Sequence, residues 1–258
     1  MVDLKCGARV LVLMLTVLTC APVIATSLSP GEYINQEGGF GRLRISALVA
    51  GKQEFFIESV GGNMHMCSVE GKILDGGAKA EAYGETCAIS MMSKGAAVRV
   101  ESESSNSCRS FCGARAGYDG LYIRLPAQCV QAAIRRTRDA FLMQYRRKLY
   151  AQARDTLAPV LSRCGRFLYF IEEGEVRNDL AVTLYHLGEY GACRNVLEPL
   201  REDAEVQDAQ AYVLRSAEPD YTSNRMKIAD KTATNLRLCR SGSKALRPPV
   251  AAPRSVEK

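Results

Sequence analysis

Sulfur is the chemistry that this sequence offers most plainly, because ten of its 258 residues are cysteine and only two are histidine. A structural zinc site usually combines closely spaced cysteine pairs with a second such pair or with histidines. No Cys-x-x-Cys pair occurs here, and Cys108-x-x-x-Cys112 alone is a weak metal signal. We therefore expect no metal site, and we expect the cysteines to form disulfides in an oxidising compartment.

The groups that act as acids, bases or nucleophiles in enzymes do not assemble into a catalytic set. His65 lies on a predicted strand without a second histidine near it in the sequence, and His186 precedes a predicted turn, so both are interpreted as structural. Glu172 and Glu173 open a predicted helix, where negative charge complements the helix dipole. A nucleophilic serine needs an adjacent base, and Ser107 has none near it in the sequence. The sequence predicts no enzyme activity and no cofactor.

The first 25 residues predict the compartment. Lys5 and Arg9 form a basic tip, residues 10–18 form an apolar run, and small or apolar residues follow, as in a cleaved secretory signal at residues 1–25. The run is shorter than the roughly 20 apolar residues that span a bilayer. We expect a periplasmic protein with no transmembrane span in the mature chain. Alternatively, the signal is that of a lipoprotein and Cys20 carries a lipid anchor, although threonine precedes it instead of a small residue.

Removal of the signal leaves eight cysteines, an even number, and all eight are expected to form disulfides. They are Cys67, Cys87, Cys108, Cys112, Cys129, Cys164, Cys193 and Cys239. Cys67 and Cys87 lie on neighbouring predicted strands, so we expect this pair first. Since five cysteines precede the helical half, either one bridge joins the two halves or one thiol stays free.

Residues 26–128 alternate apolar and polar side chains at a period of two, with glycine-containing turns about every ten residues. Arg42-Leu43-Arg44-Ile45 alternates in this way, and Ser93-Lys94-Gly95 is typical of a hairpin tip. Seven or eight short strands are buried best as a meander closed into a small antiparallel barrel, which leaves no open edge. A two-sheet sandwich is the alternative. This half carries ten basic and eleven acidic side chains, so the net charge of +6 comes almost wholly from the rest of the chain.

Glycine, aromatic and cysteine residues recur at a characteristic spacing in this half. The groups are Gly31-x-Tyr33, Gly62-Asn63-x-His65-x-Cys67, and the closing series Cys108, Cys112-Gly113, Gly120-x-Tyr122 and Cys129. Over residues 30–129 the arrangement resembles the membrane-bound C-type lysozyme inhibitor family and related periplasmic lipoproteins. The resemblance implies a stapled barrel that inserts a Ser-Gly-x-x-Tyr loop into the lysozyme cleft. That motif is absent here, and the nearest stretch is Ala116-Gly117-Tyr118-Asp119.

From Val130 onward the apolar period becomes helical, and one pattern recurs after forty residues. Tyr150-x-x-Ala153-x-x-x-Leu157-x-Pro159 returns as Tyr190-x-x-Cys193-x-x-x-Leu197-x-Pro199. Only the second copy follows a turn glycine, Gly188. The pattern resembles tetratricopeptide repeats, which implies helical hairpins. Residues 204–217 and 226–238 are expected to add capping helices, and residues 241–258 are expected to be a disordered basic tail.

Basic side chains crowd the first predicted helix, between residues 135 and 148. One interpretation is a solvated helix face. The functional interpretation is docking onto an anionic surface: phospholipid headgroups, a cell-wall polymer or an acidic protein. Nucleic acid is not expected as a partner of an exported chain.

The sequence thus predicts an α+β protein: a small disulfide-stapled antiparallel β-barrel at residues 26–128, followed by a helical module similar to tetratricopeptide repeats at residues 129–240. We expect an exported, non-enzymatic binding protein that recognises a partner protein in the cell envelope, lysozyme-like by resemblance. The expected binding residues are surface groups at the barrel closure and on the first helix, namely Arg115, Tyr118, Asp119, Tyr122, Arg135, Arg136 and Arg138. The alternatives are an envelope-assembly adaptor that binds through its hairpins, and an immunity protein against a cell-wall-targeting toxin.

Overall fold

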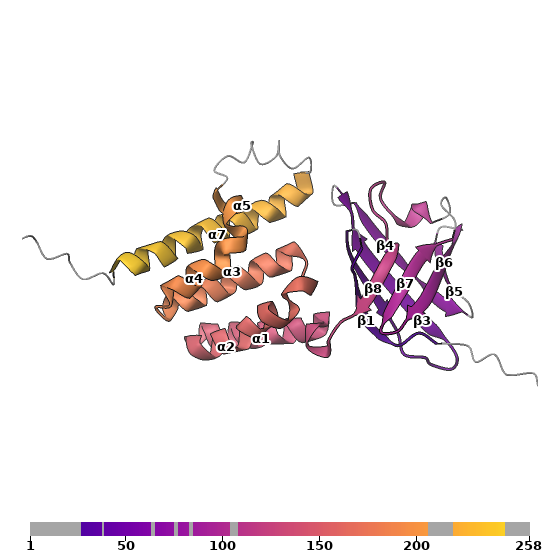
Figure 1. Cartoon of the computed structure of the whole chain (residues 1–258), viewed down its shortest axis with the longest axis horizontal. Helices are drawn as coiled ribbons and strands as arrows, with labels where there is room; N and C mark the ends of the chain where they lie inside the picture. The colour runs from indigo at the N-terminus through magenta and orange to yellow at the C-terminus, as the bar shows by residue number, and fades with distance from the viewer. Residues whose placement is uncertain are drawn as a thin grey trace, which may run out of the picture.

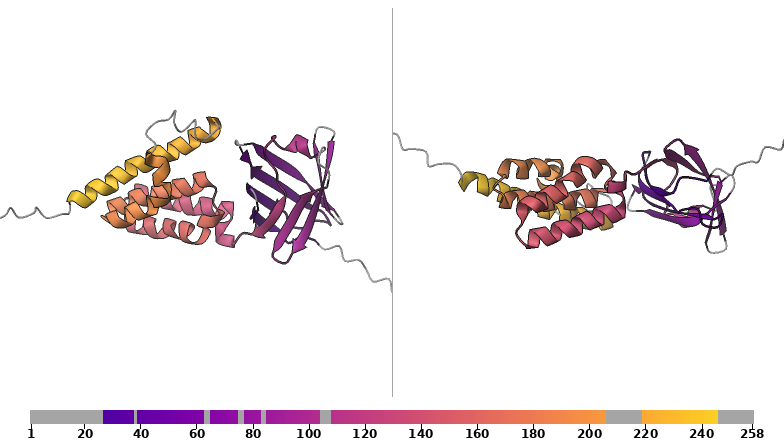
Figure 2. Two further views of the ribbon diagram at one scale, coloured as in Figure 1. Left: turned by 45° about the horizontal axis from the view of Figure 1, so that its top comes forward. Right: turned by 90° about the horizontal axis from the view of Figure 1, so that it is seen from below.

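The computed structural model describes residues 27–37, 39–62, 65–74, 77–82, 85–103, 108–205 and 219–245. The predicted signal at residues 1–25, with Cys20, lies outside these ranges, as do most of the predicted helix at residues 204–217 and most of the tail at residues 241–258. The described residues form a closed β-barrel and a module of helices, which lie end to end (Figures 1 and 2). The predicted α+β fold class is confirmed.

Eight antiparallel strands form the barrel in the order of the chain. They are β1 Gly31–Asn35, β2 Phe40–Ile45, β3 Gln53–Val60, β4 Met66–Leu74, β5 Gly77–Ala82, β6 Glu85–Lys94, β7 Ala97–Ser102 and β8 Gly120–Arg124. The meander closes where β1 pairs with β8, with Ile34 opposite Ile123. This closure excludes the alternative of a two-sheet sandwich.

The interior of the barrel is a packed core, and β3 shows how the sequence produces it. Phe55 and Ile57 are buried while Glu54 and Glu58 are exposed, because successive side chains of a strand point to opposite faces. The largest fully buried side chains of the barrel are Tyr33, Leu43, Ile57, Val69, Ile89, Val100 and Tyr122. Side chains thus fill an eight-stranded barrel, as its diameter allows.

Two disulfides fix the segment between β7 and β8 to the barrel wall. Cys67 on β4 pairs with Cys112, and Cys87 on β6 pairs with Cys108. The predicted Cys67–Cys87 bridge is therefore wrong. Strand β5 lies between β4 and β6 in the barrel, so the two strands that carry these cysteines are not neighbours. Both cysteines pair instead with the segment that covers this part of the barrel.

The helical module consists of two hairpins and further helices that pack on them. The helices are α1 Gln131–Arg146, α2 Tyr150–Cys164, α3 Phe170–His186, α4 Tyr190–Leu197, α5 Arg201–Glu205 and α7 Pro219–Ala245. The helix predicted at residues 226–238 lies within α7, which continues past residue 240 to Ala245. Cys193 on α4 pairs with Cys239 on α7 and fixes α7 to the second hairpin.

The forty-residue repeat is visible as two matching helix–turn–helix units. The turn between α1 and α2 has Lys148 at φ 60°, and the turn between α3 and α4 has Gly188 at φ 74°. The flanking hydrogen bonds also match, since Leu149 N donates to Gln144 O and Glu189 N donates to Leu184 O. Lys148 therefore takes the left-handed conformation that glycine takes in the second copy.

An apolar cluster joins the barrel to the helices, and a third bridge lies beside it within the helical half. Strand β8 ends at Arg124, and a short 3-10 helix, Ala127–Cys129, leads into α1. Cys129 pairs with Cys164 at the end of α2, so the alternative of a free thiol is wrong. Because Cys129 lies just before α1, this bridge closes the start of the helical module. Around this bridge Ile34 and Phe167 belong to one buried cluster, which connects the first strand to the helical module.

Candidate functional site

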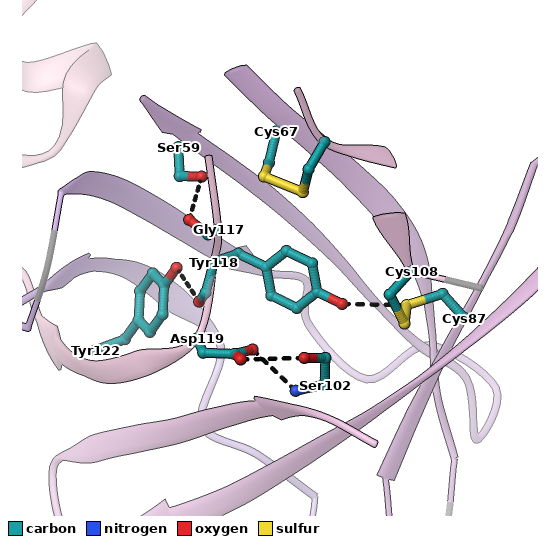
Figure 3. The surroundings of a disulfide bond; sticks show 10 residues. Ser59, Cys67, Cys87, Ser102, Cys108, Gly117, Tyr118, Asp119 and Tyr122 are labelled. Atoms are coloured by element: carbon teal, nitrogen blue, oxygen red, sulfur yellow. Dashed lines mark hydrogen bonds between the residues drawn. A yellow bond between two sulfur atoms is a disulfide. The ribbon is translucent and has the colours of Figure 1, made fainter. Parts of the chain in front are cut away.

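The predicted binding residues at the barrel closure separate into buried and exposed groups. Tyr118 and Tyr122 are 3% and 0% exposed, so the expectation that they are surface groups is wrong. The Tyr118 hydroxyl donates a hydrogen bond to the Cys87 sulfur at 3.1 Å, and the Tyr122 hydroxyl donates to the Tyr118 carbonyl at 2.7 Å (Figure 3). We call residues 108–119, which precede β8, the closing segment. The two tyrosines therefore hold the closing segment against the barrel.

Burial also changes the ionisation of these phenols. Desolvation, with a smaller contribution from the nearby Asp119 carboxylate, raises the pKa of Tyr118 to about 12. The pKa of Tyr122 is raised for the same reasons. Both phenols are therefore neutral donors at physiological pH.

Asp119 is exposed, but its carboxylate already has partners. It accepts hydrogen bonds from the Ser102 amide at 2.9 Å and from the Ser102 hydroxyl at 3.0 Å (Figure 3). The Asp119 carbonyl accepts a further bond from the Asn35 side chain at 3.2 Å. Asp119 thus ties the start of β8 to the end of β7.

Arg115 lies in a cleft between the barrel and the helical module. The cleft has a volume of about 490 Å³, and both domains line it. Its residues are Asn35, Glu37, Gly39, Phe40, Val60, Gly61, Gly62, Arg115, Gly117, Asp119, Tyr169 and Phe170. Arg115 is exposed, and its guanidinium forms no ion pair within the described ranges. We call this space the interdomain cleft.

Three aromatic rings form one wall of the interdomain cleft. The ring centroids of Phe40 and Tyr169 are 4.8 Å apart, and those of Tyr169 and Phe170 are 4.6 Å apart. Phe40 belongs to β2, whereas Tyr169 and Phe170 stand at the start of α3. The wall therefore exists only when the two domains are docked.

The carboxylates of the interdomain cleft are engaged within the protein. Arg99 forms a salt bridge with Glu37, and this hydrogen bond is the main reason why the pKa of Glu37 lies below its ordinary value. Glu37 therefore stays ionised, and Asp119 is held by Ser102. Among the described charged residues that line the cleft, Arg115 is the one left open to an incoming ligand.

Glu172 explains why the two domains keep this arrangement. Its carboxylate accepts hydrogen bonds from Arg42 on β2 at 2.7 Å, from the Gln131 side chain at 2.9 Å and from the Tyr169 amide at 3.0 Å. The last of these belongs to the capping box of α3. The predicted role of Glu172 at a helix start is thus confirmed, and the same carboxylate also links the helical module to the barrel.

The three predicted arginines of α1 lie in different environments. Arg135 and Arg136 are exposed. Arg138 instead pairs with Glu175 at 2.7 Å and with Asp179 at 3.4 Å, both on α3. Arg138 therefore joins two helices inside the module, and it is not placed as a surface group.

Neither histidine lines the interdomain cleft. His65 packs so closely on the closing segment that a Cβ at Gly113 would lie 2.5 Å from its Nδ1. His186 stacks on Tyr150, with 4.4 Å between the centroids. Within the described ranges, no three His, Cys, Asp or Glu side chains are grouped so that they could hold a metal ion. No described helix is long and apolar enough to cross a membrane.

Comparisons with protein-family models, curated proteins and solved structures find no match for this chain. The structure alone therefore establishes the eight-stranded barrel and the helical hairpins. No family match supports a relation to lysozyme inhibitors or tetratricopeptide repeats. Four disulfides are typical of an oxidising, extracytoplasmic compartment.

Sequence reasoning missed the aromatic wall of the interdomain cleft. Phe40 follows two glycines, and Tyr169 and Phe170 lie just before the acidic pair Glu172-Glu173 that opens a predicted helix. An aromatic pair before a helix N-terminus was a signal for a packed junction, but nothing in the sequence connected that pair to Phe40, 129 residues earlier.

Proposed function

We propose that this protein is an exported, non-enzymatic binding protein that takes up a segment of a partner protein in the interdomain cleft. The observation that carries the proposal is the position of Arg115, a guanidinium without an ion pair among the described residues, in the same cleft as the rings of Phe40, Tyr169 and Phe170. Arginine and aromatic side chains dominate the energetics of protein interfaces. The docked domains hold this site in place before a ligand arrives, which lowers the entropic cost of binding.

The chemistry of the interdomain cleft defines the segment that fits it. A guanidinium binds a carboxylate with charge-assisted hydrogen bonds, and the aromatic wall favours an apolar side chain. The expected ligand is therefore a peptide segment that carries an acidic residue next to an apolar one. Binding fits better than catalysis, because both carboxylates of the cleft are engaged by Arg99 and Ser102.

Selection from a displayed library of random peptides tests this function. We expect the chain without residues 1–25 to enrich peptides in which an acidic residue neighbours an apolar one. Arg115→Glu should weaken the binding of those peptides by roughly 10- to 100-fold, which corresponds to the loss of a charge-assisted hydrogen bond. Arg109→Glu, at another exposed arginine of the closing segment, is the matched control and should bind like the parent. No enrichment, or equal binding by Arg115→Glu, rejects the proposal.

A lysozyme is the more specific partner that the resemblance of residues 30–129 implies. Its support is the architecture: a small antiparallel barrel whose closing segment is stapled by two disulfides. The test is a titration of a C-type lysozyme with the purified chain. A fall in lytic rate at molar excess supports inhibition, and an unchanged rate removes lysozyme as the partner while leaving peptide binding to be judged by the Arg115 variants.

Binding through the helical hairpins alone is the second candidate function, and the repeat of the two helix–turn–helix units supports it. The chain divides between Leu125 and Pro126 without breaking any disulfide, because Cys129 pairs with Cys164. Residues 27–125 and residues 126–245 would therefore each keep their own bridges when expressed separately. Capture of a partner by residues 126–245 alone favours an adaptor, whereas a requirement for both parts favours the interdomain cleft.

A further inference from the structure

The outward face of α1 combines positive charge with exposed apolar side chains. Ile134 and Phe141 lie on the opposite face and are buried in the helical core. The residues of the outward face are Ala132, Arg135, Arg136, Asp139, Leu142, Met143, Arg146 and Arg147, which recur at intervals of three and four and are all exposed. We call these residues the basic face of α1.

The arginines of the basic face are not used for internal ion pairs. Within the part of the chain that the structure describes, Arg135, Arg136, Arg146 and Arg147 form no salt bridge. Arg138, one position away from the face, is the contrasting case, since it pairs with two carboxylates of α3. Four arginines and a single acidic residue, Asp139, therefore leave this face with a net charge of +3.

Two large apolar side chains lie among these arginines. Met143 is 63% exposed and Leu142 is 37% exposed. Leu149, just after the end of α1, is also 37% exposed and follows the basic residue Lys148. Exposed leucine and methionine side chains do not help to solvate a helix face. Their position among arginines therefore favours a binding partner whose surface offers both negative charge and apolar material.

We infer that the basic face of α1 docks on the surface of a bilayer that contains anionic phospholipids. The arginines would contact lipid phosphates, while Leu142 and Met143 enter the interface between headgroups and acyl chains, as in other peripheral amphipathic helices. Long arginine side chains suit this geometry, because their stems lie along apolar material and their charged ends stay at the phosphates. Among the described helices α1 lies at the edge of the module, below α3 and opposite α7 in Figure 1. Ala132 and Arg135, at the start of its basic face, also line a pocket against the barrel, whereas Leu142, Met143, Arg146 and Arg147 are exposed beyond it.

Vesicle binding of the chain without residues 1–25 tests the inference, since the apolar N-terminal run would itself insert into lipid. The probes are vesicles of phosphatidylcholine alone and vesicles with roughly one third phosphatidylglycerol. We expect binding to the anionic vesicles only, with a steep loss as salt is raised. Arg135→Gln/Arg136→Gln should weaken binding about 25-fold, from about fivefold for each basic residue lost near an anionic surface.

A matched variant separates this face from net charge alone. Arg237→Gln/Arg240→Gln removes two exposed arginines from α7, so the total charge changes equally, and we expect anionic-vesicle binding to stay as in the parent. Leu142→Ser/Met143→Ser should weaken vesicle binding several-fold, and the binding that remains should depend more strongly on salt concentration. Absence of binding at low salt, or equal losses in the α1 and α7 variants, overturns the inference. Binding to soluble polyglutamate but not to anionic vesicles overturns it too, and would assign the face to an acidic polypeptide.

Discussion

Arg42 Nη2 lies 2.7 Å from Glu172 Oε2, although the two residues are 130 positions apart and belong to different domains. Both side chains are mostly buried, and the same carboxylate also caps α3. A single group therefore couples the start of a helix to the docking of the barrel, and the interdomain cleft depends on both.

Replacement of Glu172 should loosen the contact between the domains. We expect Glu172→Ala to lower the free energy of unfolding by about 2–3 kcal/mol, because it removes a partly buried ion pair and a helix cap together. Scattering in solution should show a larger radius of gyration, and Arg115-dependent peptide binding should weaken. Glu173→Ala is the control, since among the described residues Glu173 forms its ion pair with Arg177 of its own helix, and such a pair contributes about 0.5 kcal/mol or less. Equal effects of the two variants would contradict the coupling.

The two hairpin turns predict opposite effects of substitution. Lys148 has φ 60°, so Lys148→Gly should stabilise the protein by about 0.5–1 kcal/mol. Gly188→Ala should destabilise it by about 1 kcal/mol, although a Cβ at this position meets no atom within 4 Å. Gly191→Ala, three residues later within α4 and also in open space, should instead stabilise by about 0.5–1 kcal/mol. Chemical denaturation measures all three, and a destabilised Lys148→Gly would show that the turns are not equivalent.

High pH should unfold the barrel through its buried phenols. The pKa of Tyr118 is about 12 in the folded protein and about 10 when unfolded. Folding favours the neutral phenol, so its contribution to the free energy of unfolding is complete below pH 10. About 2 kcal/mol of that contribution is lost as the pH rises to 12. Tyr118→Phe should be less stable than the parent at pH 7 but should lose less stability between pH 10 and 12. Parallel pH curves for the two proteins would contradict this assignment.

The four disulfides predict a graded response to removal. Replacing both cysteines of a bridge by serine should cost about 3–4 kcal/mol, with the larger loss for the longer loop. The Cys193–Cys239 bridge spans 46 residues and the Cys87–Cys108 bridge spans 21, which corresponds to a difference of about 0.7 kcal/mol. Peptide mapping without reductant should recover the four pairs found here. A peptide that links Cys67 to Cys87 would contradict the barrel described above.

The barrel was predictable because its signal is local and repeated. Alternation along strands such as β3, with turns at regular spacing, is set by the geometry of a strand and by burial on one face. The forty-residue repeat was equally visible, although its first copy has Lys148 where the second has the turn glycine. These features depend on residues that are close in the sequence.

The errors concern contacts between distant residues. Pairing of Cys67 with Cys112 depends on how the closing segment folds back over β4, which no spacing reveals. Tyr118 and Tyr122 looked like surface groups in a glycine-rich stretch, but they point into the barrel, where Tyr118 reaches the Cys87–Cys108 bridge. The interdomain cleft joins β2 to α3, so only the docked structure brings Phe40 to Tyr169.

The order of the bridges has a consequence for maturation. In the barrel the Cys67–Cys112 loop encloses the Cys87–Cys108 loop, whereas Cys129–Cys164 and Cys193–Cys239 link consecutive cysteines. An oxidase that joins sulfurs in the order in which they cross a membrane would give the helical half its native bonds directly. The same oxidase would join Cys67 to Cys87 and trap a non-native isomer. We therefore expect the yield of correctly assembled barrel, but not of the helical half, to depend on a thiol–disulfide isomerase that exchanges these bonds.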